Sequence, residues 1–234
     1  MASDFLTLGR GEIHFAPFVP GTRVPGGYRF LGNCPAFNLN VSVEELNHMK
    51  STEGFKEEDF SAIVSRTVGA SVQTDDCRPD NLAYFFLGSS ADVTQASATG
   101  MTETMTVSPG LRYRLGRTAS NPGGAKAITV TDLSDTEASP TTFAAGTDYV
   151  VESETGTIFI VQGGSIGADT EVTVTYNLAA TTFTRVISGH NEIEGELWFK
   201  SFNAAGADQD YILPYAKLRP EGDLALIGDD WVNF

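Results

Sequence analysis

The chain has 234 residues, of which 41% are hydrophobic and 19% are charged; this is the composition of a globular protein rather than of a disordered one. Lys and Arg total 15 against 30 Asp and Glu, which gives a formal net charge of −15. Affinity for nucleic acids comes mostly from neutralised phosphates, so this charge argues against a protein that grips DNA. No run of roughly eighteen apolar residues is present, and no basic segment followed by an apolar run opens the chain, so we expect no membrane span and no secretory signal.

The first part of the chain predicts an extended arm followed by two strands. Residues 1–36 are rich in Gly and Pro, with one strand-like stretch, while residues 37–45 and 60–74 alternate apolar and polar positions. The charged segment between these strands, with Gly54 at its centre, is far longer than the two to five residues that a hairpin turn needs. We therefore expect a long polar loop between two strands.

A short helix is expected next, in the segment "DDCRPDNLAYFFLG". Pro79 suits the first turn of a helix and Gly88 suits its C-terminal cap. The polar residues suited to its N-terminal end are Asp76, Asp80 and Asn81. The apolar residues at helical spacing, which we expect to pack the helix against a core, are Leu82, Phe85 and Phe86.

The remainder predicts many short strands. Residues 89–110 are weakly patterned and indicate a linker or a peripheral strand, whereas residues 146–161 predict a hairpin that turns at Glu154–Gly156. About a dozen short strands and one helix predict a mainly β protein, a sandwich or barrel with one flanking helix and a long inter-strand loop. We expect one domain, 1–234, made of 1–36, 37–88, 89–185 and 186–234, in which 89–185 is either a β-rich middle region or a separate inserted module.

Catalytic motifs are absent from the sequence. His14, His48 and His190 are far apart, and no HExxH, phosphate loop or calcium loop occurs. Cys34 and Cys77 lack the spacing of a zinc site, and we expect both to be free thiols. The sequence therefore predicts neither an enzyme nor a bound metal or cofactor.

One acidic pattern stands out near the C-terminus. Glu192, Glu194 and Glu196 alternate with small or apolar residues, so a strand here would carry three carboxylates on one face. This face is either an ordinary solvated surface or a negatively charged wall, which a closed ring of subunits would repeat around its bore.

Three stretches, in their order and spacing, resemble the major tail tube proteins of long-tailed bacteriophages. The first runs from "VSVEELNHMKSTEGFKEEDF" to the helix segment "NLAYFFLG"; the second is "GTDYVVESETGTIFIVQGGSIGADTEVTVTYNLAA"; the third is "NEIEGELWFKSFNAAGADQDYILPYAKLRPEGDLALIGDDW". Together they cover roughly 40–88 and 146–232, whereas residues 1–36 and 89–130 match only loosely.

The resemblance implies a β-sandwich that assembles into hexameric rings, which stack into the tube through which the genome leaves. It implies a virion tail protein assembled in the host cytoplasm, with a tape measure protein and a tail terminator as partners, and DNA passing through without specific binding. Glu192, Glu194 and Glu196 become candidates for the lumen wall. Residues implied to form the ring-stacking arm are Leu46, Asn47, His48, Met49, Lys50, Ser51, Thr52, Glu53, Gly54, Phe55, Lys56, Glu57, Glu58 and Asp59.

Two other classes stay open at this stage. One is a different virion component, namely a terminator, a connector or a decoration, which a separate 89–185 module would favour. The other is a carbohydrate-binding module with a platform of Trp198, Tyr211 and Tyr215.

Overall fold

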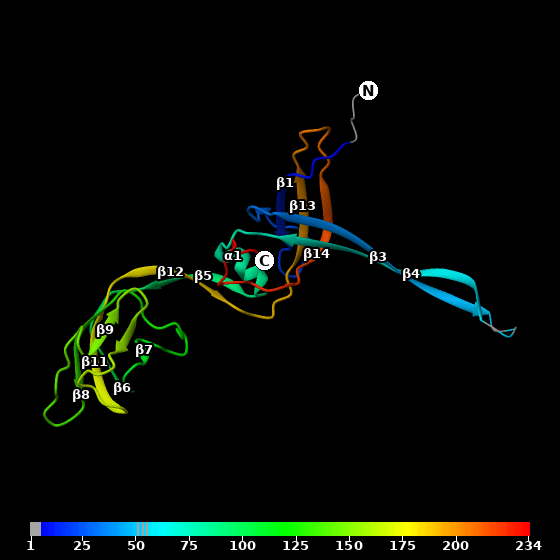
Figure 1. Cartoon of the computed structure of the whole chain (residues 1–234). Helices are drawn as coiled ribbons and strands as arrows, with labels where there is room; N and C mark the ends of the chain where they lie inside the picture. Colours follow the sequence, from blue (N-terminus) through cyan, green and yellow to red (C-terminus); the bar gives the residue numbers. More distant parts are fainter. Residues whose placement is uncertain (1–5, 51, 53, 55) are drawn as a thin grey trace. The chain divides into compact units, whose positions relative to one another are not determined.

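The computed structural model describes residues 6–50, 52, 54 and 56–234. The chain is mainly β with one short helix, which confirms the predicted fold class, and no sheet among the described residues closes into a barrel. It divides into two compact units: unit 1 comprises Met1–Ser90 and Val186–Phe234, and unit 2 comprises Ala91–Arg185 (Figure 1).

Unit 1 is built on a four-stranded antiparallel sheet in the order β14-β13-β1-β2. Its strands are β14 (Tyr211–Lys217), β13 (Glu194–Ser201), β1 (Gly11–Pro17) and β2 (Arg29–Phe30). Alternate residues of β1 and β13 fill the core, in which Ile13, Phe15 and Leu197 are buried. Gly195 lets β13 approach β1, because a Cβ there would lie 2.3 Å from the carbonyl oxygen of Ala16.

The helix α1 (Pro79–Phe85) lies in unit 1 and begins at Pro79, as predicted. No side chain caps its N-terminus, and its C-terminal end differs from the prediction. Leu87, rather than Gly88, adopts the left-handed conformation, with φ of 48°. Gly88 is needed for space instead, because a Cβ there would lie 1.7 Å from the carbonyl oxygen of Ile187.

The predicted packing residues of α1 do not form its buried face. Leu82 and Phe85 are half-buried, and Phe86 is 37% exposed. The buried positions are Asn81 and Ala83. The helix places a polar residue inward because Asn81 holds three segments together, a role that apolar periodicity cannot reveal.

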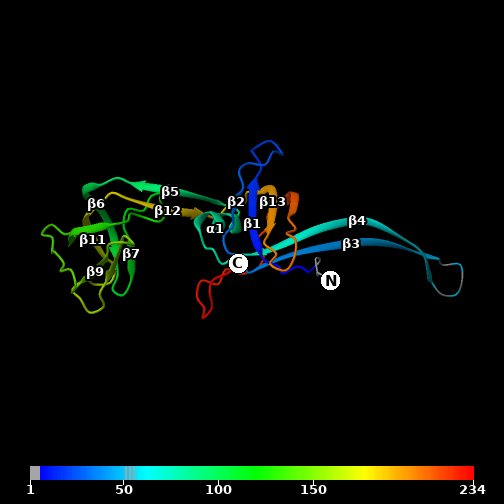
Figure 2. The same cartoon turned by 90° about the horizontal axis from the view of Figure 1, so that it is seen from above.

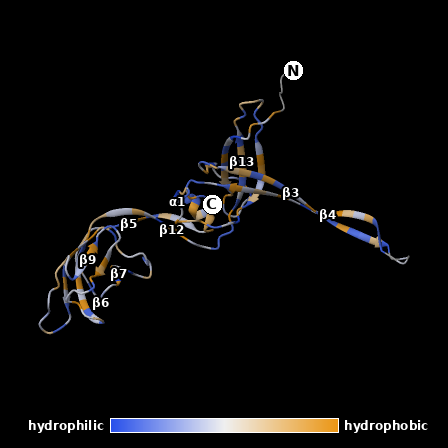
Figure 3. Cartoon of the chain, viewed as in Figure 1, coloured by the Kyte–Doolittle hydropathy of each residue, from blue (hydrophilic) through white to orange (hydrophobic). Residues whose placement is uncertain are grey.

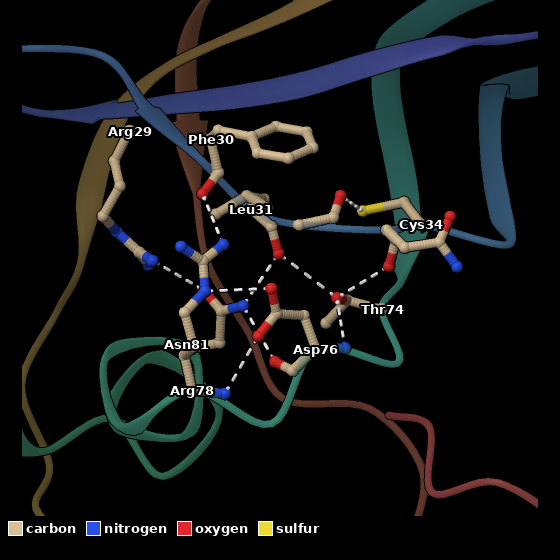
Figure 4. Close-up of polar contacts among 10 residues, drawn as sticks. Arg29, Phe30, Leu31, Cys34, Thr74, Asp76, Arg78 and Asn81 are labelled. Carbon is tan, nitrogen blue, oxygen red and sulfur yellow. Dashed lines mark hydrogen bonds and ion pairs between the residues drawn. The ribbon is translucent and has the colours of Figure 1, made fainter.

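Asn81, 3% exposed, is the centre of a buried polar network (Figure 4). Its side-chain amide donates to the carbonyls of Leu31 at 2.7 Å and Asp76 at 2.9 Å, and its oxygen accepts from Arg29 at 2.7 Å. The hydroxyl of Thr74 bonds the Leu31 carbonyl as well. Buried polar groups of this kind cost free energy unless paired, so the network fixes the helix against β2 and the end of β4.

A long hairpin, β3 (Ala36–Lys50) and β4 (Glu57–Gln73), completes unit 1. The prediction of a long polar loop over 46–59 is therefore wrong: both strands continue into that segment, and only residues 51–56 connect them. Register shifts at Glu44/Glu45 and His48/Met49 break the period-two pattern. Because both faces of the distal strands are solvated, charged residues are tolerated there, and the sequence resembles a loop.

Unit 2 is a sandwich of two three-stranded antiparallel sheets. One sheet has the order β6 (Ala98–Val107), β11 (Thr170–Leu178), β8 (Ile128–Asp135), and the other has the order β7 (Arg112–Arg114), β10 (Thr157–Ile160), β9 (Tyr149–Glu152). A single core joins them, with Leu133, Ile158 and Val174 fully buried. The predicted turn at Glu154–Gly156 is confirmed, with Gly156 at φ of 68°.

The weakly patterned segment 89–110 forms two strands. β5 (Ser89–Gln95) pairs with β12 (Thr181–Ile187), and this ladder carries the chain into and out of unit 2. β6 lies at an edge of its sheet and is largely exposed, which permits the Thr residues that weakened the sequence signal.

Candidate assembly surface

The β3–β4 hairpin is exposed along nearly its whole length. β3 has 15 residues, and at about 3.3 Å per residue it spans about 50 Å. Phe37 and Val72 pack at its root against the core of unit 1, but from Asn38 to Lys50 every side chain is exposed. Figure 2 draws the distal half as a two-stranded ribbon with no other element beside it. The hairpin therefore exposes large apolar side chains that a single folded chain does not cover.

The proximal half of the hairpin carries an apolar stripe on one face. Leu39, Val41 and Val43 alternate along β3, and the register places Ala70, Val68 and Arg66, in that order, opposite them on β4. All three β3 residues and Val68 are exposed, and orange, hydrophobic positions recur along both strands in Figure 3. The opposite face at this level is polar, with Asn40, Ser42 and Thr67 among its residues.

A β-bulge changes the face on which β4 presents its apolar side chains, although Ile63, 67% exposed and paired with Glu45, stays on the face of Leu39. Glu44 pairs with Ser65 and Glu45 with Ile63, so Val64 is an extra residue on β4. Beyond it, Leu46 and Phe60 lie on the face that was polar, and their exposures are 67% and 65%. The hairpin thus presents two apolar patches that point to opposite sides.

Polar contacts fix the other face of the distal half. The hydroxyl of Ser61 donates to the side-chain oxygen of Asn47 at 3.1 Å, and the amide of Asn47 donates to Glu58 at 3.2 Å. On the face of Leu46 and Phe60, by contrast, His48 Nδ1 lies 2.5 Å from a carboxylate oxygen of Asp59. All these contacts are exposed, so each of them adds little to the stability of the hairpin.

The predicted arm residues are brought together by the hairpin, with three exceptions that cannot be placed. Thr52 and Gly54 are exposed in the connection between the strands. Ser51, Glu53 and Phe55 lie outside the described residues. Sequence reasoning missed the proximal stripe of Leu39, Val41 and Val43, because alternation over 37–45 predicts a strand but does not show whether its apolar side is covered.

The three predicted lumen carboxylates do not all share one strand face. β13 begins at Glu194, so Glu192 precedes it and instead forms an ion pair with Lys217 at 2.7 Å. The hydrogen bond from Lys217 lowers the pKa of the Glu192 carboxyl, and the same contact raises the pKa of Lys217. Pairing with β1 and β14 makes β13 begin at Glu194. Residue alternation alone had extended the predicted strand back to Glu192.

Glu194 and Glu196 do lie on one face, each beside a tyrosine. The hydroxyl of Tyr215 donates to Glu194 at 2.7 Å, and that of Tyr28 donates to Glu196. Each carboxylate raises the pKa of its tyrosine, mainly through this hydrogen bond. Sequence reasoning missed both tyrosines, because Tyr28 lies far away in the chain and Tyr215 had been assigned to a sugar platform.

That sugar platform does not form. Trp198 pairs in register with Ile212, whereas Phe199 pairs with Tyr211, so Trp198 and Tyr211 lie on opposite faces of the sheet. Trp198 stacks on His14 at 5.1 Å between ring centroids and donates from Nε1 to Asp210. Trp198 and Tyr211 therefore cannot contact the same flat ligand.

The remaining chemistry of the described residues is sparse. No group of three His, Cys, Asp or Glu residues in the described part is placed to hold a metal ion. Cys34 and Cys77 are free thiols, and burial raises the pKa of Cys34. The described part of the chain contains no helix with the length and hydropathy that a membrane crossing requires.

A family model described as "Protein of unknown function UCP028589" matches residues 6–234, nearly the whole sequence. The chain belongs to this family. No curated protein matches it at a significant level. Family membership therefore covers the hairpin, the helix and unit 2 together.

Proposed function

We propose that this protein is the major tail tube subunit of a long-tailed bacteriophage, which assembles into hexameric rings that stack into a tube. The observation that carries the proposal is the β3–β4 hairpin with its two unpartnered apolar patches. The resemblance of its sequence to the ring-stacking segment of tail tube proteins supports the same assignment.

The energetics of the hairpin favour burial against another molecule. An isolated two-stranded hairpin is marginally stable in water, and exposed apolar strands favour association. Burial of apolar surface contributes roughly 25 cal/mol per Å². Covering Leu46 and Phe60, now 67% and 65% exposed, would therefore stabilise a contact between neighbouring rings. In a stack, this contact is heterologous and does not close, so it propagates into a filament.

The charge of the chain suits a conduit for DNA. Each chain has a formal net charge of −15. A tube of such chains offers few cationic side chains to replace the counterions of the phosphates, so DNA would pass through without adhering. Glu194 and Glu196 are candidates for the lumen wall under this proposal. The tape measure protein and the tail terminator are its expected partners, and the virion tail is its expected location.

A second candidate is another virion component, such as a decoration. The observation that favours it is the division of the chain, since Ala91–Arg185 forms a compact unit with its own core. Electron microscopy distinguishes the two candidates, because a decoration is expected to form neither rings nor tubes by itself.

The test is a shortened hairpin. Replacing residues 45–64 with Asn-Gly joins Glu44 to Ser65, which already pair, through a two-residue turn. We expect the wild-type protein to form six-fold rings or tubes on concentration, as seen by negative-stain electron microscopy, and the shortened protein to remain folded without forming tubes.

Circular dichroism and thermal melting serve as the folding control. Tubes formed by the shortened, folded protein would contradict the stacking role of the hairpin. A wild-type protein that stays monomeric at high concentration would contradict the tube itself.

A further inference from the structure

Residues 219–233 form a loop of unit 1 that is held at both ends. Leu218, just before the loop, packs against the apolar core of unit 1. Just after it, Phe234 exchanges two backbone hydrogen bonds with Thr74, at 2.9 and 3.0 Å, and its ring lies edge-on to that of Phe85, with 5.2 Å between the centroids. Because both ends are fixed to the body of unit 1, the loop differs from a frayed segment.

Between these two anchors, the loop exposes large apolar side chains. Leu226 is 77% exposed, Ile227 is 98% exposed and Trp231 is 92% exposed. Among the described residues, no backbone hydrogen bond joins residues 219–233 to another segment. Figure 2 draws this loop in red, projecting from unit 1 away from the hairpin. Neighbouring apolar side chains with so much exposure on an anchored loop indicate a contact that one chain does not make.

The exposed apolar residues of the loop are accompanied by acidic ones. Asp229 and Asp230 stand between Ile227 and Trp231. Neither aspartate takes part in an ion pair within the part of the chain that the structure describes. A surface that complements the loop therefore has to present apolar side chains and a cation close together.

The proximal stripe of the β3–β4 hairpin has both properties on one face. Val68 is exposed on this face, and Arg66, which pairs in register with Val43, follows it on β4. Arg66 forms no ion pair with any described residue. The next β3 residue on this face is Glu45, whose carboxylate accepts a hydrogen bond from the Ser61 hydroxyl at 3.3 Å. Exposed apolar side chains and an unpaired cation thus lie side by side on the stripe.

The spacing of the residues in the loop matches the spacing on the stripe. Val68 and Arg66 are two residues apart on one face of β4, and Ile227 and Asp229 are two residues apart in the loop. In an extended chain, residues two apart point to the same side and are separated by about 7 Å. An extended loop would therefore place its apolar and its acidic side chain on their counterparts together. The loop bends around Gly228 in the single chain, so docking requires it to straighten there, which a glycine permits.

We propose that the loop 219–233 of one chain docks on the proximal stripe of a second copy, with Ile227 against Val68 and Asp229 paired with Arg66. The contact rests on the self-assembly that the tail tube proposal requires, and it adds a second connection between subunits beside the distal patch of the hairpin. Each chain carries one loop and one stripe, so the contact is heterologous and repeats from subunit to subunit.

Disulfide trapping between two different variants tests the contact. Ile227→Cys and Val68→Cys are prepared as separate proteins, each with Cys34→Ala and Cys77→Ala, then mixed under tube-forming conditions with a mild oxidant. We expect a disulfide between positions 227 and 68 of two chains, identified by mass spectrometry of the linked peptides. The matched control replaces Val68→Cys with Thr67→Cys, on the opposite face, and should give roughly tenfold less product because its Cβ points away.

The outcomes separate this contact from the tail tube proposal. Tubes that form without the 227–68 disulfide, or with no more of it than the control gives, would overturn the docking and leave the tube proposal intact. A wild-type protein that forms no rings or tubes would contradict both. A disulfide within single chains of the Ile227→Cys/Val68→Cys double variant, with none between the mixed proteins, would show that the loop covers the stripe of its own chain and would also overturn the docking.

A charge swap tests the pairing of Asp229 with Arg66. Arg66→Asp or Asp229→Arg alone should raise the protein concentration needed for tube formation roughly two- to tenfold, because each change places like charges together. The double variant restores opposite charges and should return this concentration towards the wild-type value. Asp223→Arg, in the same loop but outside the contact, is the control for the change in net charge. A double variant that assembles no better than either single variant would refute the pairing.

Discussion

The sandwich of unit 2 and the β3–β4 hairpin both alternate apolar and polar residues, but the apolar side chains are buried in the sandwich and exposed on the hairpin. In unit 2, two sheets face each other, so alternate side chains such as Leu133 and Val174 are fully buried. In the hairpin, a single pair of strands has nothing across from it, and Leu46 remains 67% exposed. The comparison teaches that an alternating strand specifies an apolar face, while the partner of that face can belong to another molecule.

The largest expected effect is on assembly. Adding charge to the distal patch with Leu46→Asp and Phe60→Asp should abolish tube formation, because a docked carboxylate would have to be desolvated without a partner. The control is Asn47→Asp with Ser61→Asp, which adds the same charge at the same level on the opposite face. Negative-stain electron microscopy measures the outcome, and equal loss in both pairs would refute a role for that face.

The second prediction compares the stability contributed by two leucines. Leu133→Ala, at a position with no exposure, should lower the free energy of unfolding by about 2–5 kcal/mol, because it leaves a cavity in the core. Leu46→Ala should change it by less than about 0.5 kcal/mol. Urea unfolding followed by circular dichroism measures both, with separate transitions allowed for the two units. A large loss for Leu46→Ala would mean that the hairpin stabilises the single chain.

The smallest expected effect depends on pH and lies in unit 2. Asp148 accepts backbone N–H bonds from Ser165 at 2.7 Å and Ala144 at 2.8 Å, and these bonds lower the pKa of its carboxyl. A lowered pKa means that its contribution to stability is full above the ordinary aspartate pKa and is lost as the pH falls through the folded value.

Asp148→Asn should therefore destabilise unit 2 at pH 7 and do so less as the pH falls below about 4. Thermal melting across this range measures the effect, with Glu154→Gln, at an exposed position in the β9–β10 turn, as the control. A penalty for Asp148→Asn that does not vary with pH would contradict the assignment to the ionised carboxylate.

Local signals in the sequence were sufficient where structure is decided locally. Pro79 marks the first residue of α1, and Glu154–Gly156 forms its turn, because a fixed φ and a glycine act through neighbouring residues alone. The alternating segments predicted the mainly β class for the same reason.

Features set by pairing between distant segments could not be derived from sequence. The extension of β3 to Lys50 depends on bulges that offset its partner strand, and the start of β13 at Glu194 depends on β1 and β14.

Under the tail tube proposal, the apolar patches on either side of the bulge at Glu44/Glu45 are two separate binding surfaces of the hairpin. Because the proximal and distal patches point to opposite sides, one hairpin can join two neighbours that do not contact each other there. A neighbour held at Leu39 and Val41 would keep the patch of Leu46 and Phe60 at a high effective concentration for the next one. Each hairpin would then bind two neighbouring subunits. Because either patch alone binds weakly, subunits would add to the end of an existing tube more readily than they would start a new one.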